Sequence, residues 1–406
     1  MLSTRPTLED ANELGAGAAE ARMRELVETV APTLRATTDV SESLRRLAPE
    51  AMDAMVDAGI LRALVPSAYH GSELGPVHGI KLFEELGSID SAAAWVGAIS
   101  AAGAWLISLL PVEAADEVLG DRLAVVNGSL FPPLAATPAP GGYRVSGRSS
   151  FASGCDYATW IQCQAVIMRD GVPQIGANGA PIAILIHVPA TQVEIIDTWH
   201  TLGMRGTGSN DFQIGEAFVP EHLTWRMGPV SPANPAFTDG FTRMGVWWFS
   251  PLIASVALGI ARAAIDDLVD LAQRKTSSYT HVELADKSIV QDRLARARAV
   301  VDASRAYLYS ALGEADAVVR RLPRLGIHEG LPLALAGSCA VEASSQAVDL
   351  VHSCVGTSGV RDEHRFQRYF RDVHTISQHA FASPARFESI GKLMLGRESD
   401  WPFYYL

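Results

Sequence analysis

The stretch TWHTLGMRGTGSNDFQIGEAFVP, residues 198–220, decides how the rest of the chain is interpreted. A dinucleotide-binding G-x-G-x-x-G turn is excluded, because the spacing here is G-x-x-G-x-G and a strand follows where a helix is required. A P-loop is excluded because G-K-[ST] is missing. Two interpretations remain. The stretch is either an ordinary glycine-rich turn before a strand from Asp211, or a loop whose donors Arg205, Thr207 and Ser209 face an anion or a cofactor.

Length and composition predict a globular chain of two or three domains. The 406 residues are more than a single hydrophobic core usually serves, and 48% hydrophobic with 19% charged residues allows a large buried interior. The formal net charge of −12 and the lack of a basic run argue against nucleic-acid binding.

From the sequence we expect neither a secretory signal nor a membrane span. We find no uncharged apolar stretch of about 18 or more residues, so we expect no membrane span. The N-terminal MLSTRPTLEDANELG contains acids and lacks an apolar core, which excludes a secretory signal. The four cysteines, at 155, 163, 339 and 354, show no C-x-x-C spacing. We expect reduced thiols in a cytoplasmic protein, with neither a zinc site nor a disulfide framework.

The patterning divides the chain into three regions, which predict an α+β fold that is mainly α. Residues 1–120 are expected to be helical: SESLRRLAPEAMDAMVDAGI predicts a helix with Ser41 or Ser43 as N-cap, and SAAAWVGAISAAGAWLISLL predicts a buried helix. The sequence pattern of residues 121–228 predicts short strands. That of residues 229–406 predicts four long helices of an up-and-down bundle.

The strands of the middle region are expected to form a small barrel or sandwich. Each expected strand is short, rich in β-branched or aromatic residues and bounded by Gly, Pro or Asp. They are GGYRVSGRSSFASG, YATWIQCQAVI, APIAILIHVP, VEIIDTW and NDFQIGEAFVP. The D-G pair in MRDGVPQIGANGAP predicts a tight turn.

A second stretch, GRSSFASGCDYATW, places Phe151, Ser153 and Gly154 at a strand end. An ordinary strand and turn would explain it. The functional alternative is an aromatic ring beside a planar cofactor, with a hydroxyl aimed at one of its heteroatoms.

A third stretch, RDVHTISQHAFASPARFESIG, gathers His374 and His379 near Asp372 and Arg371. On one continuous helix, Asp372 and His379 would share a stripe, and Arg371 and His374 the adjacent one. A single histidine is more often a structural residue, whereas this cluster favours function. A metal site is not expected, because the histidines are five residues apart and no H-E-x-x-H accompanies them.

Other features favour structural roles. Trp95 in SAAAWVGAIS either lines a pocket or belongs to the core, and Trp247 in WWF belongs to the core or an oligomer contact. Asn127 lies at a junction between regions, where we expect a turn. No G-x-S-x-G motif supports nucleophilic hydrolysis.

The three stretches, in this order across a helix–β–helix chain, resemble the acyl-CoA dehydrogenase fold. More narrowly, they resemble its flavin-dependent monooxygenase branch (group D), which includes the oxygenase components of two-component phenol hydroxylases such as the hydroxyphenylacetate and steroid-ring hydroxylases. The resemblance covers about Pro32 to Gly396. It implies an N-terminal helical domain over 1–120, a middle β-barrel over 121–228 and a C-terminal four-helix bundle over 229–406.

The resemblance also implies roles for individual residues. Ser153 would contact the N5/C4a edge of the flavin, with Phe151 packed on the ring and Gly154 in register. The residues expected along the cofactor are Asn127, Arg205, Thr207, Gly208 and Ser209. Dehydrogenases of this fold often carry a Glu-Gly after the R-D pair, where the glutamate abstracts the substrate α-proton. This chain has His379 in that region, which favours oxygenation over desaturation.

A reaction follows from the same resemblance. A separate reductase would supply reduced FMN or FAD, and O₂ would form a C4a-hydroperoxyflavin that hydroxylates a phenol- or indole-like substrate. His379, Ser153 and His374 would be catalytic, and Trp95, His374 and Trp247 would face the substrate. Relatives are homotetramers, in which Arg274 and Gln291 would reach a neighbouring subunit.

Three alternatives stay open at this point. The chain could be an acyl-CoA dehydrogenase that takes its base from Glu342 or Glu363. It could be an N- or S-oxygenating relative. It could also be a helical scaffold without catalytic activity. The identity of the substrate and the choice between FMN and FAD are not fixed by the sequence.

Overall fold

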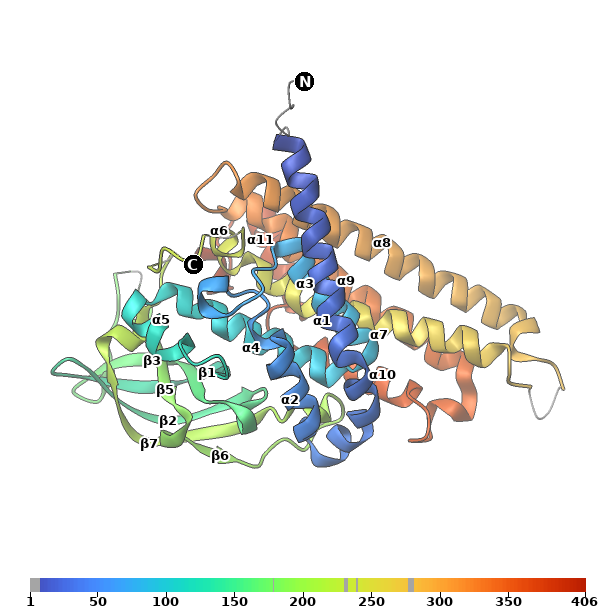
Figure 1. The fold of residues 1–406 in the computed structure, drawn as a ribbon, viewed down its shortest axis with the longest axis horizontal. Coiled ribbons are helices and arrows are strands. Elements are labelled where there is room, and N and C mark those ends of the chain that lie inside the picture. Colours follow the sequence, from blue (N-terminus) through green and yellow to red (C-terminus); the bar gives the residue numbers. More distant parts are fainter. Residues whose placement is uncertain (1–7, 178, 230–232, 239, 277–280) are drawn as a thin grey trace, which may run out of the picture.

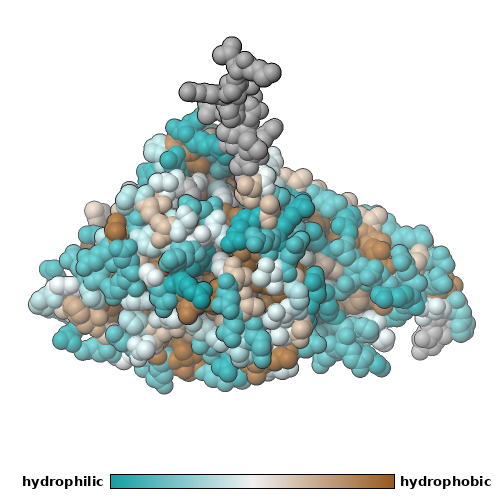
Figure 2. Space-filling model, in the orientation of Figure 1, coloured by the Kyte–Doolittle hydropathy of each residue, from teal (hydrophilic) through white to brown (hydrophobic). Residues whose placement is uncertain are grey.

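The structure is a computed structural model that describes residues 8–177, 179–229, 233–238, 240–276 and 281–406. The β-sheet lies at one side of the molecule and the long C-terminal helices at the other, with the N-terminal helices between them (Figure 1). Hydrophilic residues cover most of the face seen in Figure 2, and apolar residues lie between them in small patches.

In the described part of the chain, five α-helices precede the sheet, at α1 (Leu8–Leu44), α2 (Pro49–Ala58), α3 (Pro76–Ile89), α4 (Ser91–Leu106) and α5 (Val112–Leu119). The prediction that one helix starts near Ser41 was wrong. Ser41 lies inside α1, and its hydroxyl accepts a hydrogen bond from the backbone N–H of Ala48. Arg45 adopts a left-handed φ of 56°, which ends α1 and lets Pro49 begin α2.

Helix α4 is the buried helix that its Ala- and Gly-rich sequence predicts. Ser91–Leu109 is 19 residues long and apolar enough to cross a membrane, so the expectation that no uncharged stretch reaches this length was wrong. However, 89% of its most apolar window is buried inside the protein, which is the environment of a core helix. Gly103 allows close packing, because a Cβ there would lie 2.3 Å from the carbonyl oxygen of Val126.

Among the residues that the structure describes, eight strands follow, in the hydrogen-bonded order β6-β7-β2-β1-β3-β5-β8, with β4 paired to β3. Their bounds are β1 (Val126–Ala139), β2 (Gly142–Ala152), β3 (Trp160–Arg169), β4 (Val172–Pro173), β5 (Ala183–Pro189), β6 (Glu194–Ile196), β7 (Asn210–Pro220) and β8 (Thr224–Arg226). All five predicted segments contain a strand. The D-G turn is confirmed, since Asp170 and Gly171 have φ of 51° and 78° between β3 and β4.

Strand β1 was missed because its sequence contains prolines, which usually argue against a central strand. The structure accommodates them in an irregularity, since the pairing of β1 with β3 shifts between Ser129 and Leu134. Asn127 therefore lies in a strand, and the expected turn there was wrong.

The C-terminal region consists of α6 (Gly240–Met244), α7 (Phe249–Ala272), α8 (Ser288–Val319), α9 (Ile327–Val355), α10 (Phe366–Ile376) and α11 (Ala385–Met394). Helix α9 packs against α7, α8 and α10, as the predicted bundle requires. Glu84 of α3 joins this bundle to the N-terminal helices, because its fully buried carboxylate meets Arg262 of α7 and Arg305 of α8.

Candidate functional site

The glycine-rich loop lies between the sheet and the helices. Its glycines allow close packing and a left-handed turn. Met204 and Gly208, with φ of 54° and 53°, flank a single 3₁₀ turn over Arg205–Thr207. At Gly203, a Cβ would lie 2.2 Å from the carbonyl oxygen of Arg371. Only glycine at this position lets the loop rest directly on α10.

Two consecutive residues of α10 hold this loop in place. The Arg371 Nη1 donates to the carbonyl oxygen of Leu202 at 2.7 Å. The Asp372 carboxylate accepts from the Met204 backbone N–H at 2.6 Å and from the Ser91 hydroxyl at 2.5 Å. Burial raises the pKa of Asp372 to about 6, although both hydrogen bonds act in the opposite direction. The R-D pair thus ties the loop to α4 and α10.

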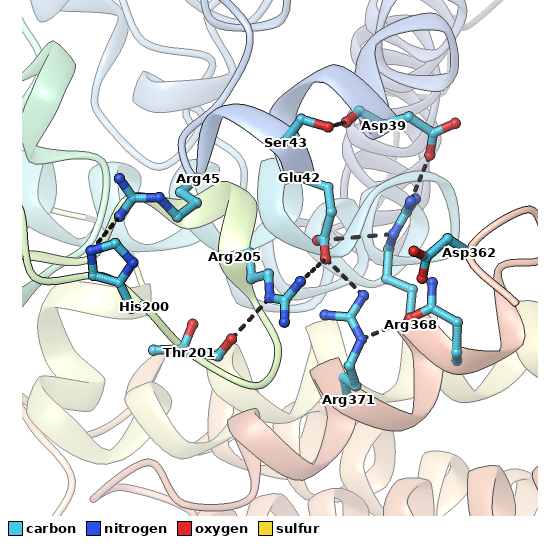
Figure 3. A pocket seen from close by; sticks show the side chains of 11 residues that line it. Asp39, Glu42, Ser43, Arg45, His200, Thr201, Arg205, Asp362, Arg368 and Arg371 are labelled. Carbon is cyan, nitrogen blue, oxygen red and sulfur yellow. Dashed lines mark hydrogen bonds and ion pairs between the residues drawn. The ribbon is translucent and has the colours of Figure 1, made fainter. Parts of the chain in front are cut away.

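A cavity of about 720 Å³ lies beside this clamp (Figure 3). Three guanidinium groups approach Glu42 of α1, from Arg371 at 2.7 Å, Arg205 at 3.7 Å and Arg368 at 4.0 Å. Arg45 at the same cavity is paired with Asp197. Arg368 also pairs with Asp39, so the wall of the cavity carries an ion-pair network that joins α1, the loop and α10.

The second stretch forms the floor of the candidate site. Phe151 holds a left-handed φ of 63°, exposes 69% of its surface and packs edge-on against Trp199. Ser153, two residues later, is buried and accepts a hydrogen bond from the Trp95 indole Nε1 at 2.9 Å. Gly154 has a φ of 70°, and its N–H donates to the Thr207 carbonyl oxygen at 2.8 Å.

Asn127 links the backbone at Ser153 to helix α4 through hydrogen bonds of its side-chain amide. Its amide nitrogen donates to the Ser153 carbonyl oxygen at 2.7 Å, and its amide oxygen accepts from the Ser100 hydroxyl at 2.6 Å. Both ends of the buried amide are therefore engaged within the protein, which gives Asn127 a positioning role. A direct contact between Asn127 and the cofactor stays a prediction.

His379 faces the same site from the C-terminal region. Helix α10 ends at Ile376, so the prediction of one helical stripe reaching His379 was wrong. The imidazole meets Trp95 edge-on at 5.2 Å between ring centroids. Burial lowers its pKa to about 4, so the ring is neutral near pH 7. The Phe381 N–H donates a long 3.4 Å hydrogen bond to Nδ1, a contact that favours the tautomer with the ring proton on Nε2.

An aromatic cluster extends from His379 and was not predicted. Phe381 lies 6.0 Å from the His379 ring and contacts three further aromatic rings. These are Phe249 at 5.4 Å, Trp401 at 5.3 Å and Phe403 at 5.1 Å. The only signal in the sequence was the aromatic density of AFASPARF and WPFYYL, which no periodicity links to the site.

Two other predicted residues make contacts that do not involve His379 or Phe381. His374 forms a 2.9 Å ion pair with Asp349 of α9 and packs on Phe370. Trp247 is buried in a parallel stack on Tyr404 at 4.9 Å. The catalytic and substrate-facing roles of these two residues stay predictions.

The proposed contacts to a neighbouring subunit also stay predictions. The Arg274 Nε donates to the Asp270 carbonyl oxygen, and the Gln291 amide to that of Ala285. Both interactions are local to the chain.

The two carboxylates that could serve a dehydrogenase lie on the surface. Glu342 is on the exposed side of α9, and Glu363 is exposed in a 3.8 Å ion pair with Arg361. Neither is brought to Ser153 or His379 by a contact in the described part of the chain. This arrangement favours oxygenation over desaturation.

The residues that are present fit a reduced flavin. An exposed aromatic ring at Phe151 offers a flat apolar surface, and the buried Ser153 hydroxyl offers a polar atom beside it. The neutral His379 and the indole of Trp95 complete one side of the site.

Replacing Asp372 with alanine should loosen the glycine-rich loop. The substitution leaves the buried Met204 N–H and Ser91 hydroxyl without their partner, at a cost of about 1–3 kcal/mol in the free energy of unfolding. Chemical denaturation measures this loss. Glu388→Ala on α11, which removes an exposed ion pair with Lys392, is the control and should change stability by less than about 0.5 kcal/mol. Equal stability of the Asp372→Ala variant and the parent would contradict the clamp.

The pKa of His379 predicts a pH dependence of stability. The usual pKa of about 6.5 applies to the unfolded chain, whereas the folded value is about 4. Between these values the unfolded chain binds the extra proton, so the parent loses stability as the pH falls from about 6.5 toward 4. The free energy of unfolding of the parent exceeds that of the His379→Asn variant by an amount that should shrink as the pH falls from about 6.5 to about 4. Above about pH 6.5 this difference should stay constant. A pH-independent difference would contradict a partly buried imidazole that stays neutral.

Comparisons with known proteins agree with this geometry. The model of the acyl-CoA dehydrogenase N-terminal domain matches residues 18–117, and that of the C-terminal domain matches residues 251–384. Together these matches cover more than half of the chain.

Named relatives extend the comparison over most of the chain. An indole-3-acetate monooxygenase of Pseudomonas putida is 28% identical over 87% of this chain and 88% of its own. The oxygenase component of an FADH₂-dependent resorcinol hydroxylase from Rhizobium sp. is 29% identical over 92% of this chain and 93% of its own. The structure of XiaF from Streptomyces sp., in complex with FADH₂ and glycerol, superposes with a TM-score of 0.88 at 24% identity, covering 97% of this chain and 99% of that one. The chain therefore belongs to the acyl-CoA dehydrogenase family, among relatives that are flavin-dependent oxygenases.

Proposed function

We propose that this chain is the oxygenase component of a two-component flavin-dependent monooxygenase that hydroxylates a small phenol- or indole-like substrate. One observation carries the proposal: His379, a neutral imidazole, contacts the Trp95 indole, which also donates to the Ser153 hydroxyl. The named relatives, which include an indole-3-acetate monooxygenase and a resorcinol hydroxylase, support the same class of reaction.

Each residue of the site has a role in this proposal. Reduced FMN or FAD, when bound, supplies the electrons that activate O₂. Ser153 would hold the N5 edge of the ring and Phe151 would pack on its face. His379 has its proton on Nε2, so it donates a hydrogen bond to an oxygen atom of the reacting groups. The aromatic cluster at Phe381 excludes water from the reaction.

The tautomer distinguishes two roles for His379. A general base needs a free nitrogen lone pair, and here the Nδ1 lone pair accepts from the Phe381 N–H. The hydrogen-bond donor role therefore fits the geometry better than deprotonation of a phenol.

Partners follow from the same proposal. The sequence lacks a nicotinamide-binding fingerprint, so a separate reductase delivers the reduced flavin. We place the enzyme in the cytoplasm as a homotetramer, in which a neighbouring subunit completes the flavin site. Light scattering of the purified protein tests the assembly state.

An oxygen-uptake assay tests the proposed function. Reduced flavin is supplied by a generic reductase, and a panel of phenols, indoles and amines is screened for uptake coupled to product. The expected result is coupled uptake with at least one phenol or indole. Acyl-CoA with an artificial electron acceptor, under anaerobic conditions, tests the dehydrogenase alternative. Desaturation in that assay, without oxygenation in the first, would overturn the proposal.

A further inference from the structure

Arg386, in the first turn of α11, is a buried cation with no ion pair in the described part of the chain. The residue is only 9% exposed, and its Nε and Nη1 have no hydrogen-bond partner among the described residues. Its guanidinium lies 4.0 Å from the centroid of the Trp401 ring. The Trp401 indole Nε1 is also buried and unpartnered. Buried donors of two side chains therefore lie together, and no described residue supplies an acceptor for them.

The acidic groups close to Arg386 in the sequence are paired with another residue. Asp400 accepts from the Ser389 hydroxyl at 2.8 Å and pairs with Lys392 at 3.3 Å. Glu388 pairs with the same lysine at 2.7 Å. Burial lowers the pKa of Arg386, and these more distant carboxylates offset that effect only in part. A buried charge without a partner is costly, and a cation at the start of a helix also opposes the helix dipole, so an anion is favoured here.

This guanidinium adjoins the aromatic cluster that extends from His379. The Phe381 ring lies 6.0 Å from the His379 ring and 5.3 Å from the Trp401 ring. Phe403 packs on both Phe381 and Trp401, at 5.1 Å and 4.8 Å between ring centroids. Flat apolar surfaces thus meet a cation that has unused donors. This combination fits a planar ring that carries an anionic substituent.

We propose that Arg386 is a specificity-determining residue that pairs with a carboxylate on the aromatic substrate, so that the enzyme prefers aromatic acids to uncharged phenols and indoles. The inference rests on the proposed function. A carboxylate has only acceptor atoms and one negative charge, so it supplies both the acceptors and the counter-charge that the guanidinium lacks. The ring of the same molecule lies along the aromatic cluster toward His379.

The experiment compares the affinity of an acid with that of its matched amide. The probes are indole-3-acetate with indole-3-acetamide, and 4-hydroxyphenylacetate with 4-hydroxyphenylacetamide, because each amide keeps the size of the acid and removes its charge. Anaerobic titration calorimetry of the protein loaded with reduced FMN or FAD gives the Kd of each probe without turnover. The parent should bind at least one acid about tenfold more tightly than its amide, which is the size of one charge-assisted hydrogen bond.

Two variants remove the charge of Arg386. Arg386→Gln keeps a polar end, and Arg386→Met keeps an apolar stem against the Trp401 ring. Each variant should bind the acid and the amide with nearly equal affinity. A purely structural role of Arg386 would weaken both probes alike and leave their ratio unchanged. The control is Arg397→Gln, which removes an exposed arginine beyond the end of α11 and should keep the parent ratio.

The outcomes distinguish this inference from the function on which it rests. If the parent binds neither acid more tightly than its amide, or if both variants keep the parent ratio, the inference is overturned, while coupled oxygen uptake with an uncharged phenol or indole still supports the proposed function. If one variant does not fold, the other decides between the same results. If neither folds, Arg386→Lys decides, since it keeps the charge without the planar fork: a smaller preference for the acid supports the inference and an unchanged one overturns it. A parent that binds no reduced flavin overturns the proposed function together with the inference.

Discussion

Replacing His379 with alanine is expected to lower the rate of product formation by a factor of about 10²–10³, while reduced flavin still binds. The expected size is that of removing one hydrogen-bond donor preorganised in a water-excluded site. His379 is neutral, since burial lowers its pKa to about 4, and it contacts Trp95, whose indole donates to Ser153. Oxygen consumption should continue in the variant, with release of H₂O₂ in place of product. Rapid-mixing assays of product and peroxide measure both.

Two further substitutions make this result specific. His222→Ala removes a histidine that forms a surface pair with Glu117, and its product yield should match the parent. His374→Ala ranks the two histidines that the sequence could not separate, because His374 pairs with Asp349 and not with Trp95. Parent-like product formation in His379→Ala would contradict the role of His379.

Replacing Glu84 with glutamine is expected to destabilise the protein by about 3 kcal/mol, at the lower end of what breaking a buried ion pair costs. The Glu84 carboxylate is fully buried and meets Arg262 at 2.5 Å, Arg305 at 2.6 Å and the Tyr309 hydroxyl at 2.6 Å. Burial and the adjacent carboxylate raise the pKa of Tyr309 well above 10, so the phenol stays protonated and donates. Glutamine has nearly the same size as glutamate, but it lacks the negative charge that pairs with Arg262 and Arg305.

Urea denaturation of the Glu84→Gln variant measures this loss. The matched control is Asp292→Asn, which breaks an exposed ion pair with Arg296 on α8 and should cost less than about 0.5 kcal/mol. Because Glu84 joins α3 to α7 and α8, its loss should also reduce the cooperativity between the N-terminal helices and the bundle. A loss no larger than that of the control would show that the buried pair does not stabilise the fold.

The sequence predicts the order of elements well because the three regions differ in periodicity. Helices of the bundle and strands such as β7 follow from local pattern alone. Strand β1 does not, because its prolines contradict a central strand and only tertiary pairing with β3 accommodates them. The break at Arg45 also depends on tertiary structure, since nothing in SESLRRLAPE signals a left-handed residue.

The candidate site could be predicted only in part. The sequence predicts Phe151, Ser153 and His379 as site residues, and the structure brings Ser153 and His379 into contact with Trp95. It could not separate His374 from His379, because the helix was assumed to continue past Ile376. The hydrogen bonds that join Ser153 to Trp95 and Ser209 also require coordinates, since these three residues are far apart in the sequence.

The central claim is that this chain inserts an oxygen atom from O₂ into an aromatic substrate with electrons from a reduced flavin. The most direct measurement is a single turnover of the protein, loaded anaerobically with reduced flavin and then mixed with ¹⁸O₂ and the substrate found in the uptake screen. Mass spectrometry should find one ¹⁸O atom in each product molecule, and His379→Ala should yield little labelled product. Product that carries no ¹⁸O, or oxidation of the flavin that yields peroxide alone with every substrate of the panel, would contradict the claim.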